Sequence, residues 1–277
     1  MEKRRGIIAL DLDGTLLNSD KQLSPGNIAA LKAADSAGYE IVPTTGRFYN
    51  AIPEVVRDLP FVRYAITING AAVEDLKTNE VIYRAEIPLM QAIDIMAMLD
   101  KWPVIYDCFM DSAAWVTDEF KNHVDEMIQS HHYRKMFREL RHSVPELKEF
   151  VKTQGKSIQK MQFFTCHPEV RLRLMTEIPQ MFPNIYTSSS LPDNLEINQT
   201  RANKGEALLA LAAHLGVPAE NTVAFGDGTN DLTMIKMAGL GIAMENAVPE
   251  IKEVADRVTA SCDEDGVAKG IELLLKY

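Results

Sequence analysis

Cysteines, aromatic residues and long apolar runs are scarce in this 277-residue sequence. Its three cysteines, Cys108, Cys166 and Cys262, lie far apart and form no CxxC pair, which excludes a disulfide framework and a cysteine zinc site. Asp11 and Asp13 interrupt the first apolar run at once, so we expect no signal peptide. No apolar run approaches the roughly 18 residues that a membrane helix needs. These absences predict a reduced, soluble, cytoplasmic protein with no membrane partner.

Positive charge is also in short supply. Lysine and arginine total 29 against 39 aspartate and glutamate residues, which gives a net charge of −10. This balance excludes an overall electrostatic footprint for nucleic acid, so we expect no nucleic-acid partner. Apolar residues at 46% and charged residues at 25% form the ordinary globular mixture and exclude a disordered or fibrous chain. The length favours a core domain with one sizeable insertion over two equal halves.

Short apolar segments alternate with helical patterns near the start of the chain. We expect buried strands at 6–10, 39–43 and 64–68, and a helix around 49–59. Another helix follows Ser24, which is expected to cap it, with Pro25 in its first turn. Strand and helix alternating at this spacing predict right-handed βαβ units and a parallel sheet.

The last third of the chain repeats the same alternation. We expect strands at 222–225, 240–244 and 257–259, and helices at 204–215, 232–238, 248–255 and 266–275. The predicted fold class is therefore α/β, with a doubly wound, Rossmann-like parallel sheet as its core.

The composition changes between these two parts. The middle segment holds both tryptophans, nine of the 13 methionines and five of the six histidines. Its strand and helix patterns indicate an inserted α/β module. We therefore expect a core domain formed by 1–82 and 195–277 and an inserted domain formed by 83–194.

Polar clusters follow the expected strands of the core at the point where each strand ends. The clusters are Asp11-x-Asp13-Gly-Thr15, Thr45-Gly46-Arg47, Asn69-Gly70 and Gly226-Asp227-x-x-Asn230-Asp231. Ligands of doubly wound sheets bind at this edge, so we expect the clusters to converge. Converging carboxylates repel one another unless a divalent cation lies among them, and hard oxygen ligands suit Mg²⁺.

A site with Mg²⁺, a cationic side chain and hydroxyl donors fits phosphoryl transfer. The sequence has no GxxxxGK[ST] motif, so a P-loop nucleotide triphosphatase is not expected. A carboxylate can instead attack phosphorus and form an aspartyl-phosphate. Asp11 and Asp13, two positions apart on an extended segment, point the same way, so one can attack while the other carries the proton.

These motifs resemble those of the haloacid dehalogenase superfamily. Asp11-Leu-Asp-Gly-Thr-Leu, Thr45-Gly-Arg, Lys204-Gly and Gly226-Asp-Gly-x-Asn-Asp are similar to the family's four motifs. The insertion is similar in position and size to the C2-type cap, and the segment 247–268 resembles the Cof-type phosphatases. The resemblance implies a Mg²⁺-dependent phosphatase that acts on a small phosphate ester, a sugar phosphate or similar, beneath a cap that sets substrate specificity.

The resemblance also implies catalytic and metal-binding roles. Asp11 would be the nucleophile and a metal ligand. Asp13 would be the general acid and then the general base, with its main-chain carbonyl on Mg²⁺. Lys204 would neutralise the phosphoryl group and restrain Asp11. Asp227 and Asp231 would hold the metal, and turns at these positions could also simply cap the following helix.

The remaining motif residues would bind the phosphate. Thr45 would hydrogen-bond to the phosphoryl oxygens, and it would count among the catalytic residues. Gly46, Arg47, Asn69 and Asn230 would line the same pocket, together with Lys204.

Three other functions stay open at this point. A phosphomutase would use the same aspartyl chemistry but needs a second phosphate. A signalling receiver also carries an acidic cluster, a Thr and a Lys, but its phosphorylated Asp ends a middle strand of a smaller domain. A non-catalytic binding protein is not favoured, because every expected catalytic position is filled.

The inserted domain contains one basic stretch, from His131 to His142. It includes Arg134, Lys135, Arg138 and Arg141. The stretch could steer an anionic substrate, but a solvated helix face is the favoured interpretation.

Overall fold

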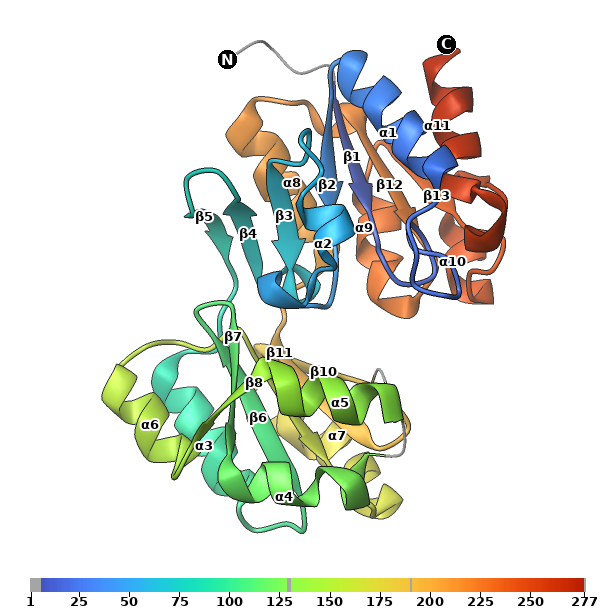
Figure 1. Ribbon diagram of the computed structural model, residues 1–277. Helices are drawn as coiled ribbons and strands as arrows, with labels where there is room; N and C mark the ends of the chain where they lie inside the picture. The colour runs from blue at the N-terminus through green and yellow to red at the C-terminus, as the bar shows by residue number, and fades with distance from the viewer. Residues whose placement is uncertain (1–5, 129–130, 190, 277) are drawn as a thin grey trace. The chain divides into compact units, whose positions relative to one another are not determined.

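The computed structural model describes residues 6–128, 131–189 and 191–276 (Figure 1). Contacts divide the chain into two compact units. Unit 1 consists of Met1–Arg47, Ile52–Arg84 and Arg201–Tyr277, and unit 2 consists of Phe48–Ala51 and Ala85–Thr200. The sequence predicted boundaries after residues 82 and 194. These boundaries stay predictions, as do the roles of the two parts as core and cap.

Unit 1 is built on a five-stranded sheet in the order β14-β13-β12-β1-β2, in which every neighbouring pair is parallel. Its strands are β1 (Gly6–Leu10), β2 (Tyr39–Pro43), β12 (Thr222–Gly226), β13 (Leu240–Ala243) and β14 (Arg257–Val258). Strands β1, β2 and β12 are buried along their whole length, as continuous apolar runs such as GIIAL predict. The predicted parallel sheet is confirmed.

Two pairs of helices pack with this sheet. Helix α1 packs against α11, and α8 packs against α9, while α10 also contacts α9. Their bounds are α1 (Pro25–Ser36), α8 (Lys204–Leu215), α9 (Leu232–Met237), α10 (Pro249–Val254) and α11 (Gly266–Leu275). The predicted cap of α1 is confirmed, because the Ser24 side chain accepts a hydrogen bond from the amide of Asn27.

The predicted third parallel strand is only partly correct. Strand β3 (Tyr64–Thr67) forms a separate antiparallel sheet with β4 (Ala72–Asp75) and β5 (Glu80–Arg84). Isolated parallel bridges join the segments around β2 and β3, Ile41 with Val62 and Thr44 with Ile66. The chain reverses after β3 because Asn69, at φ 55°, and Gly70, at φ 91°, adopt left-handed backbone conformations.

The predicted helix at 49–59 is only partly correct. The segment instead forms a 3₁₀ turn, Tyr49–Ala51, and the single helical turn α2 (Glu54–Arg57). Pro53 separates the two, because a proline disfavours helical geometry at the residue before it.

Unit 2 contains a six-stranded sheet in the order β10-β11-β9-β6-β7-β8, antiparallel except between β7 and β8. The strands are β6 (Ile105–Met110), β7 (Ala113–Thr117), β8 (Arg141–Val144), β9 (Lys160–Phe164), β10 (Ile185–Ser188) and β11 (Asn194–Gln199). The helices are α3 (Leu89–Leu99), α4 (Asp118–Met127), α5 (His131–Leu140), α6 (Leu147–Gln154) and α7 (Pro168–Met181). Alternate strand residues such as Cys108, Met161 and Leu195 form an apolar core with residues of α3, α6 and α7.

The other residues of these strands include a group of buried charges. The Nε of Arg141 donates to Oδ2 of Asp107 at 2.7 Å, and its guanidinium lies over the ring of Phe137. The side chain of Arg141 is 2% exposed, so the expectation of a solvated basic stretch is wrong for this residue. Arg138 is exposed and pairs with Asp125. The side chains of 131–133 lie outside the described part of the structure.

Among the described residues, no helix combines the length and the apolar character that crossing a bilayer requires.

Candidate active site

The candidate site lies in unit 1, where β1 ends and the loop toward α1 begins. The amide of Asp11 donates to the carbonyl of Phe225 at 3.0 Å, which continues the pairing of β1 with β12 beyond the last residue of β1. The carboxylate of Asp11 is buried. Strand pairing therefore places Asp11 beside the end of β12, next to the turn that carries Asp227 and Asp231.

Lys204 joins two of these carboxylates. Its Nζ donates to Oδ1 of Asp11 at 2.6 Å and to Oδ1 of Asp231 at 2.5 Å. Lys204 is the first residue of α8, whose start is fixed by the Asn203 side chain accepting from the amide of Glu206. Burial alone would lower the pKa of Lys204, but the two carboxylates raise it above its ordinary value. The ammonium is therefore held in its charged form inside the protein.

The turn after β12 orients the other two carboxylates. Oδ2 of Asp231 accepts from the amides of Asp227 and Gly228, both at 3.0 Å. Oδ1 of Asp227 accepts from the hydroxyl of Thr15 at 2.7 Å. The turn, which was also open to interpretation as a simple helix cap, therefore fixes two carboxylates next to Asp11.

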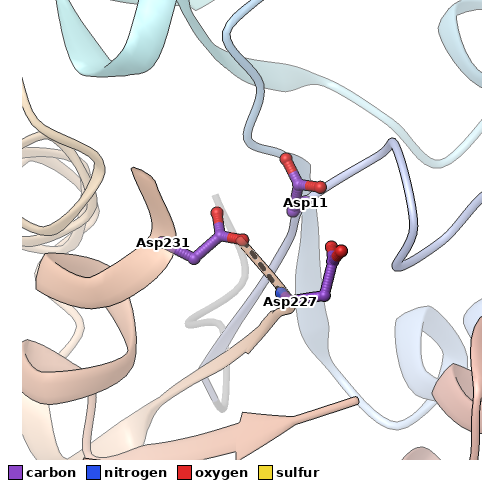
Figure 2. Close-up of side chains that lie close together, drawn as sticks. All are labelled: Asp11, Asp227 and Asp231. Atoms are coloured by element: carbon purple, nitrogen blue, oxygen red, sulfur yellow. Dashed lines mark hydrogen bonds between the residues drawn. The ribbon is translucent and has the colours of Figure 1, made fainter. Parts of the chain in front are cut away.

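Three carboxylates form a group that could hold a cation. One oxygen each of Asp11, Asp227 and Asp231 lies within 4.8 Å of the others, and Figure 2 shows the three side chains side by side. Burial raises the pKa of Asp11 to about 8, with Lys204 opposing and the neighbouring carboxylates adding to the shift. Burial likewise raises the pKa of Asp227 to about 6. In both groups burial disfavours the charged form more strongly than the hydrogen bonds and the cation around them favour it.

The side chain of Asp13 makes a different set of contacts. Its two carboxylate oxygens accept from Nε and Nη2 of Arg47, both at 2.8 Å, and Oδ1 also lies 3.0 Å from Nζ of Lys21. Burial favours the neutral form, but Arg47 and Lys21 outweigh it and lower the pKa of Asp13 to about 2. The predicted contribution of Asp13 to the metal, through its main-chain carbonyl, stays a prediction.

Several residues that were predicted to bind phosphate come together beside the carboxylates of Asp11, Asp227 and Asp231. The amide of Asn69 donates to the carbonyl of Thr45 at 3.0 Å, and Nδ2 of Asn230 donates to Oδ1 of Asn69 at 3.3 Å. The hydroxyl oxygen of Thr45 accepts from the amide of Arg47 at 3.1 Å. A Cβ on Gly46 would lie 2.8 Å from Oδ1 of Asn69, so the absence of a side chain lets these segments approach.

Two contacting residues received no role from the sequence. Lys21 holds Asp13, and Asn246 donates from Nδ2 to the carbonyl of Gly14 at 2.8 Å while its Oδ1 accepts from the amide of Cys262 at 2.9 Å. Both residues make these contacts from loops, and no spacing or motif in the sequence indicates them.

Comparisons with known proteins agree with this geometry. A family model described as haloacid dehalogenase-like hydrolase matches residues 8–271. Phosphatase YwpJ of Bacillus subtilis is 31% identical over 97% of this chain and 99% of its own. The 5-amino-6-(5-phospho-D-ribitylamino)uracil phosphatase YcsE of the same organism is 32% identical over 96% of this chain and 94% of its own.

A solved structure gives the same result. A haloacid dehalogenase-like hydrolase from B. subtilis is 29% identical and matches with a TM-score of 0.82, over 97% of this chain and 99% of that one. The resemblance seen in the motifs is confirmed over nearly the whole length. The chain belongs to the haloacid dehalogenase-like hydrolase family, as a phosphatase.

Proposed function

We propose that this phosphatase uses Mg²⁺ and hydrolyses a small phosphorylated metabolite, a sugar phosphate or similar, through an aspartyl-phosphate on Asp11. The observation that carries the proposal is the position of Lys204, whose ammonium binds Asp11 and Asp231 together in a buried site. A fixed cation beside a carboxylate nucleophile suits the attack of that carboxylate on a phosphate dianion.

The carboxylates of Asp11, Asp227 and Asp231 fit a magnesium ion. They offer hard oxygen ligands close together. Burial first, and repulsion from the neighbouring carboxylates second, raise the pKa values of Asp11 and Asp227, and a bound divalent cation would oppose both effects. Bound there, Mg²⁺ supplies positive charge against the oxygens of the transferring phosphoryl group.

Asp11 carries out the first chemical step. Its Oδ1 is held by Lys204, and the other carboxylate oxygen attacks phosphorus. The bond between phosphorus and the leaving oxygen breaks, and Asp13 gives a proton to that oxygen, so the alcohol departs neutral. Asp13 takes up this proton only when its carboxylate is released from Arg47 and Lys21, because these cations favour its charged form. Lys204 and the hydroxyl of Thr45 stabilise the charge on the phosphoryl oxygens.

Asp13 acts again in the second step. Its carboxylate takes a proton from a water molecule, and the resulting hydroxide attacks the phosphorus of the aspartyl-phosphate. The bond to Asp11 breaks, which regenerates its carboxylate and releases inorganic phosphate. Asn69, Asn230, Arg47 and the backbone at Gly46 line the pocket of the phosphate.

The proposed substrate class draws support from a relative. YcsE is named for a substrate whose phosphate is carried on a ribityl chain, a sugar-derived polyol. We assign recognition of the remainder of the substrate to unit 2, in keeping with the predicted role of the inserted domain.

The test is phosphate release from a panel of sugar, polyol and nucleoside monophosphates, with Mg²⁺ and with EDTA. We expect release that needs Mg²⁺ and is lost in Asp11→Asn. Asp94→Asn is the matched control, because Asp94 is exposed on α3 in unit 2, and it should keep full activity. The proposal would be contradicted if the wild-type protein binds Mg²⁺, as followed by thermal stabilisation, but releases phosphate from none of the esters.

A further inference from the structure

Asn198 is a buried amide side chain that forms no hydrogen bond. It lies on β11 and is 0% exposed, and neither its Nδ2 nor its Oδ1 has a partner in the part of the chain that the structure describes. Buried polar side chains are hydrogen-bonded in the large majority of cases, and an unpaired one destabilises the folded state. Leucine has the same branched shape and needs no partner. The amide of Asn198 therefore calls for a reason other than the stability of unit 2.

Alternation along β11 places Asn198 on one face of the sheet of unit 2. Ile197, the residue before it, lies in the apolar core, so Asn198 and Glu196 lie on the opposite face. Ile197 pairs with Met161, which makes Lys160 the neighbour of Asn198 on that opposite face. We call this side of the sheet the polar face, and its buried polar residues include Asp107, Arg141, Lys160, Gln162, Glu196 and Asn198.

The four charges of the polar face are paired with one another. Nζ of Lys160 donates to Oε1 of Glu196 at 3.2 Å, and Nε of Arg141 donates to Oδ2 of Asp107 at 2.7 Å. Nε2 of Gln162 donates to the same oxygen of Asp107 at 2.9 Å. These charges sum to zero, so they offer no surplus cation to a second phosphate or to a carboxylate of a substrate. Amides and paired charges both donate and accept, which matches hydroxyl groups.

An aromatic side chain, Phe109, lies on the same polar face, opposite Lys160. Nζ of Lys160 lies 4.6 Å from the centroid of the Phe109 ring, and the guanidinium carbon of Arg141 lies 5.7 Å from it. The ring of Phe48, also in unit 2, lies 5.8 Å from that of Phe109. Phe48 directly follows Arg47, which is predicted to line the phosphate pocket. The chain thus leads from the proposed phosphate pocket to the polar face within one residue.

We propose that Asn198 is a specificity-determining residue, whose amide binds hydroxyl groups of an uncharged, polyhydroxylated part of the substrate. The inference rests on the proposed function, because it takes the phosphate ester from there. Lys160 and Glu196 bind further hydroxyl groups of the same ligand, and the ring of Phe109 contacts its C–H groups. A ligand without hydroxyl groups leaves these buried polar groups unpaired, so it binds less well.

The experiment measures kcat and KM for two esters. One is the sugar or polyol phosphate that the wild type hydrolyses best, and the other is phenyl phosphate, whose leaving group carries no second hydroxyl. We expect Asn198→Leu to raise KM about tenfold for the first ester, with kcat changed less than about twofold. KM for phenyl phosphate should stay within about twofold of the wild type. The melting temperature should rise by about 2 °C, because the unpaired amide is gone.

Two further variants separate specificity from structure. Asn198→Ala removes the amide with a smaller side chain, so it excludes overpacking by leucine as the cause, and it should show the same difference between the two esters. Asn122→Leu is the matched control, because Asn122 is exposed on α4 in unit 2, and it should leave both KM values unchanged.

The two proposals fail in distinguishable ways. An active wild type whose Asn198 variants raise KM by the same factor for both esters, or for neither, overturns the role of Asn198 and leaves the proposed function standing. A wild type that hydrolyses phenyl phosphate but no sugar or polyol phosphate also overturns this inference, and leaves the aspartyl-phosphate chemistry standing. A wild type that hydrolyses no ester overturns the proposed function, and this inference with it.

Discussion

The ammonium of Lys204 lies 2.6 Å from the carboxylate of Asp11, although the two residues are 193 positions apart in the chain. Lys204 is also fully buried, at 0% exposure. It stands at the start of α8, and Asp11 stands at the end of β1, so the contact depends on the packing of the whole of unit 1. Removing the lysine tests how much this contact contributes to the free energy of unfolding.

Lys204→Met should lower both stability and activity. The substitution leaves Asp11 and Asp231 buried without their shared cation, which costs about 3–5 kcal/mol when one partner of a buried ion pair is removed. Urea unfolding of the metal-free protein measures this loss. Lys269→Met, at an exposed position of α11, should change the free energy of unfolding by less than about 0.5 kcal/mol. Equal stabilities of the two variants would contradict the structural role of Lys204.

The stability of the metal-free protein should depend on the ionisation of Asp227. Its pKa rises from 3.8, the ordinary value, to about 6 in the folded state. Between these values the folded protein binds more protons than the unfolded chain, so the free energy of unfolding falls as the pH rises from about 4 to about 6. This loss is on the order of 2 kcal/mol. Asp227→Asn should lack it, and urea unfolding in EDTA across this pH range measures the difference. Parallel pH profiles of the two proteins would contradict the prediction.

Mg²⁺ should offset the loss of stability that ionised Asp227 causes in the metal-free wild type. A ligand that binds only the folded state stabilises it by about 2.7 kcal/mol at 100 times its dissociation constant, which raises the melting temperature by several degrees. Asp227→Asn should show a much smaller rise at the same Mg²⁺ concentration, since it has lost one of the three carboxylates. Asp94→Asn should rise as the wild type does. A full rise in Asp227→Asn would remove this residue from the metal site.

Gly14→Ala should damage the site beyond its backbone strain. Gly14 has φ 92°, and a Cβ there would lie 2.5 Å from Oδ2 of Asp227. Gly155, at φ 66°, has open space around an added Cβ, so Gly155→Ala is destabilised only by the left-handed backbone conformation. We expect Gly14→Ala to lose most of its Mg²⁺-dependent stabilisation and Gly155→Ala to keep it. Thermal unfolding with and without Mg²⁺ checks both, and an intact Mg²⁺ response in Gly14→Ala would be the contrary result.

Arg141→Met should destabilise unit 2. The change leaves the carboxylate of Asp107, which is 0% exposed, without its cation, and we expect a loss of about 3–5 kcal/mol. Arg138→Met is the matched control, because the side chain of Arg138 is 48% exposed and its ion pair with Asp125 is open to solvent. Chemical unfolding followed by tryptophan fluorescence is suited to the comparison, since Trp102 and Trp115 both lie in unit 2. Similar losses in the two variants would contradict the assigned burial of Arg141.

The strand ends that carry the site were predictable from sequence. Continuous apolar runs such as Gly6–Leu10 specify buried parallel strands, and polar residues directly after them are carried to one edge of the sheet. Asp11, Asp227 and Asp231 meet for this reason. Lys204, by contrast, was singled out by resemblance to the family, because a lysine in the first turn of an ordinary helix has no local signature of its partners.

Contacts made by loops were not predictable. The bond between Asn246 and Gly14 joins residues 232 positions apart, and it depends on how two loops pack. The same is true of Lys21 and Asp13, whose contact needs a left-handed turn that the lysine itself disfavours. The separate antiparallel sheet of β3 was not expected, because the alternation of strands and helices in this part of the chain favoured a third parallel strand.

A direct measurement of the aspartyl-phosphate tests the central claim. Excess protein is mixed with the best ester of the panel in Mg²⁺, quenched with acid within the first turnover, and its peptides are examined by mass spectrometry. We expect one phosphoryl group on the peptide that carries Asp11, labile to hydroxylamine and absent from Asp11→Asn. Phosphate release at the normal rate with no phosphorylated peptide at any time before the first turnover is complete would contradict it.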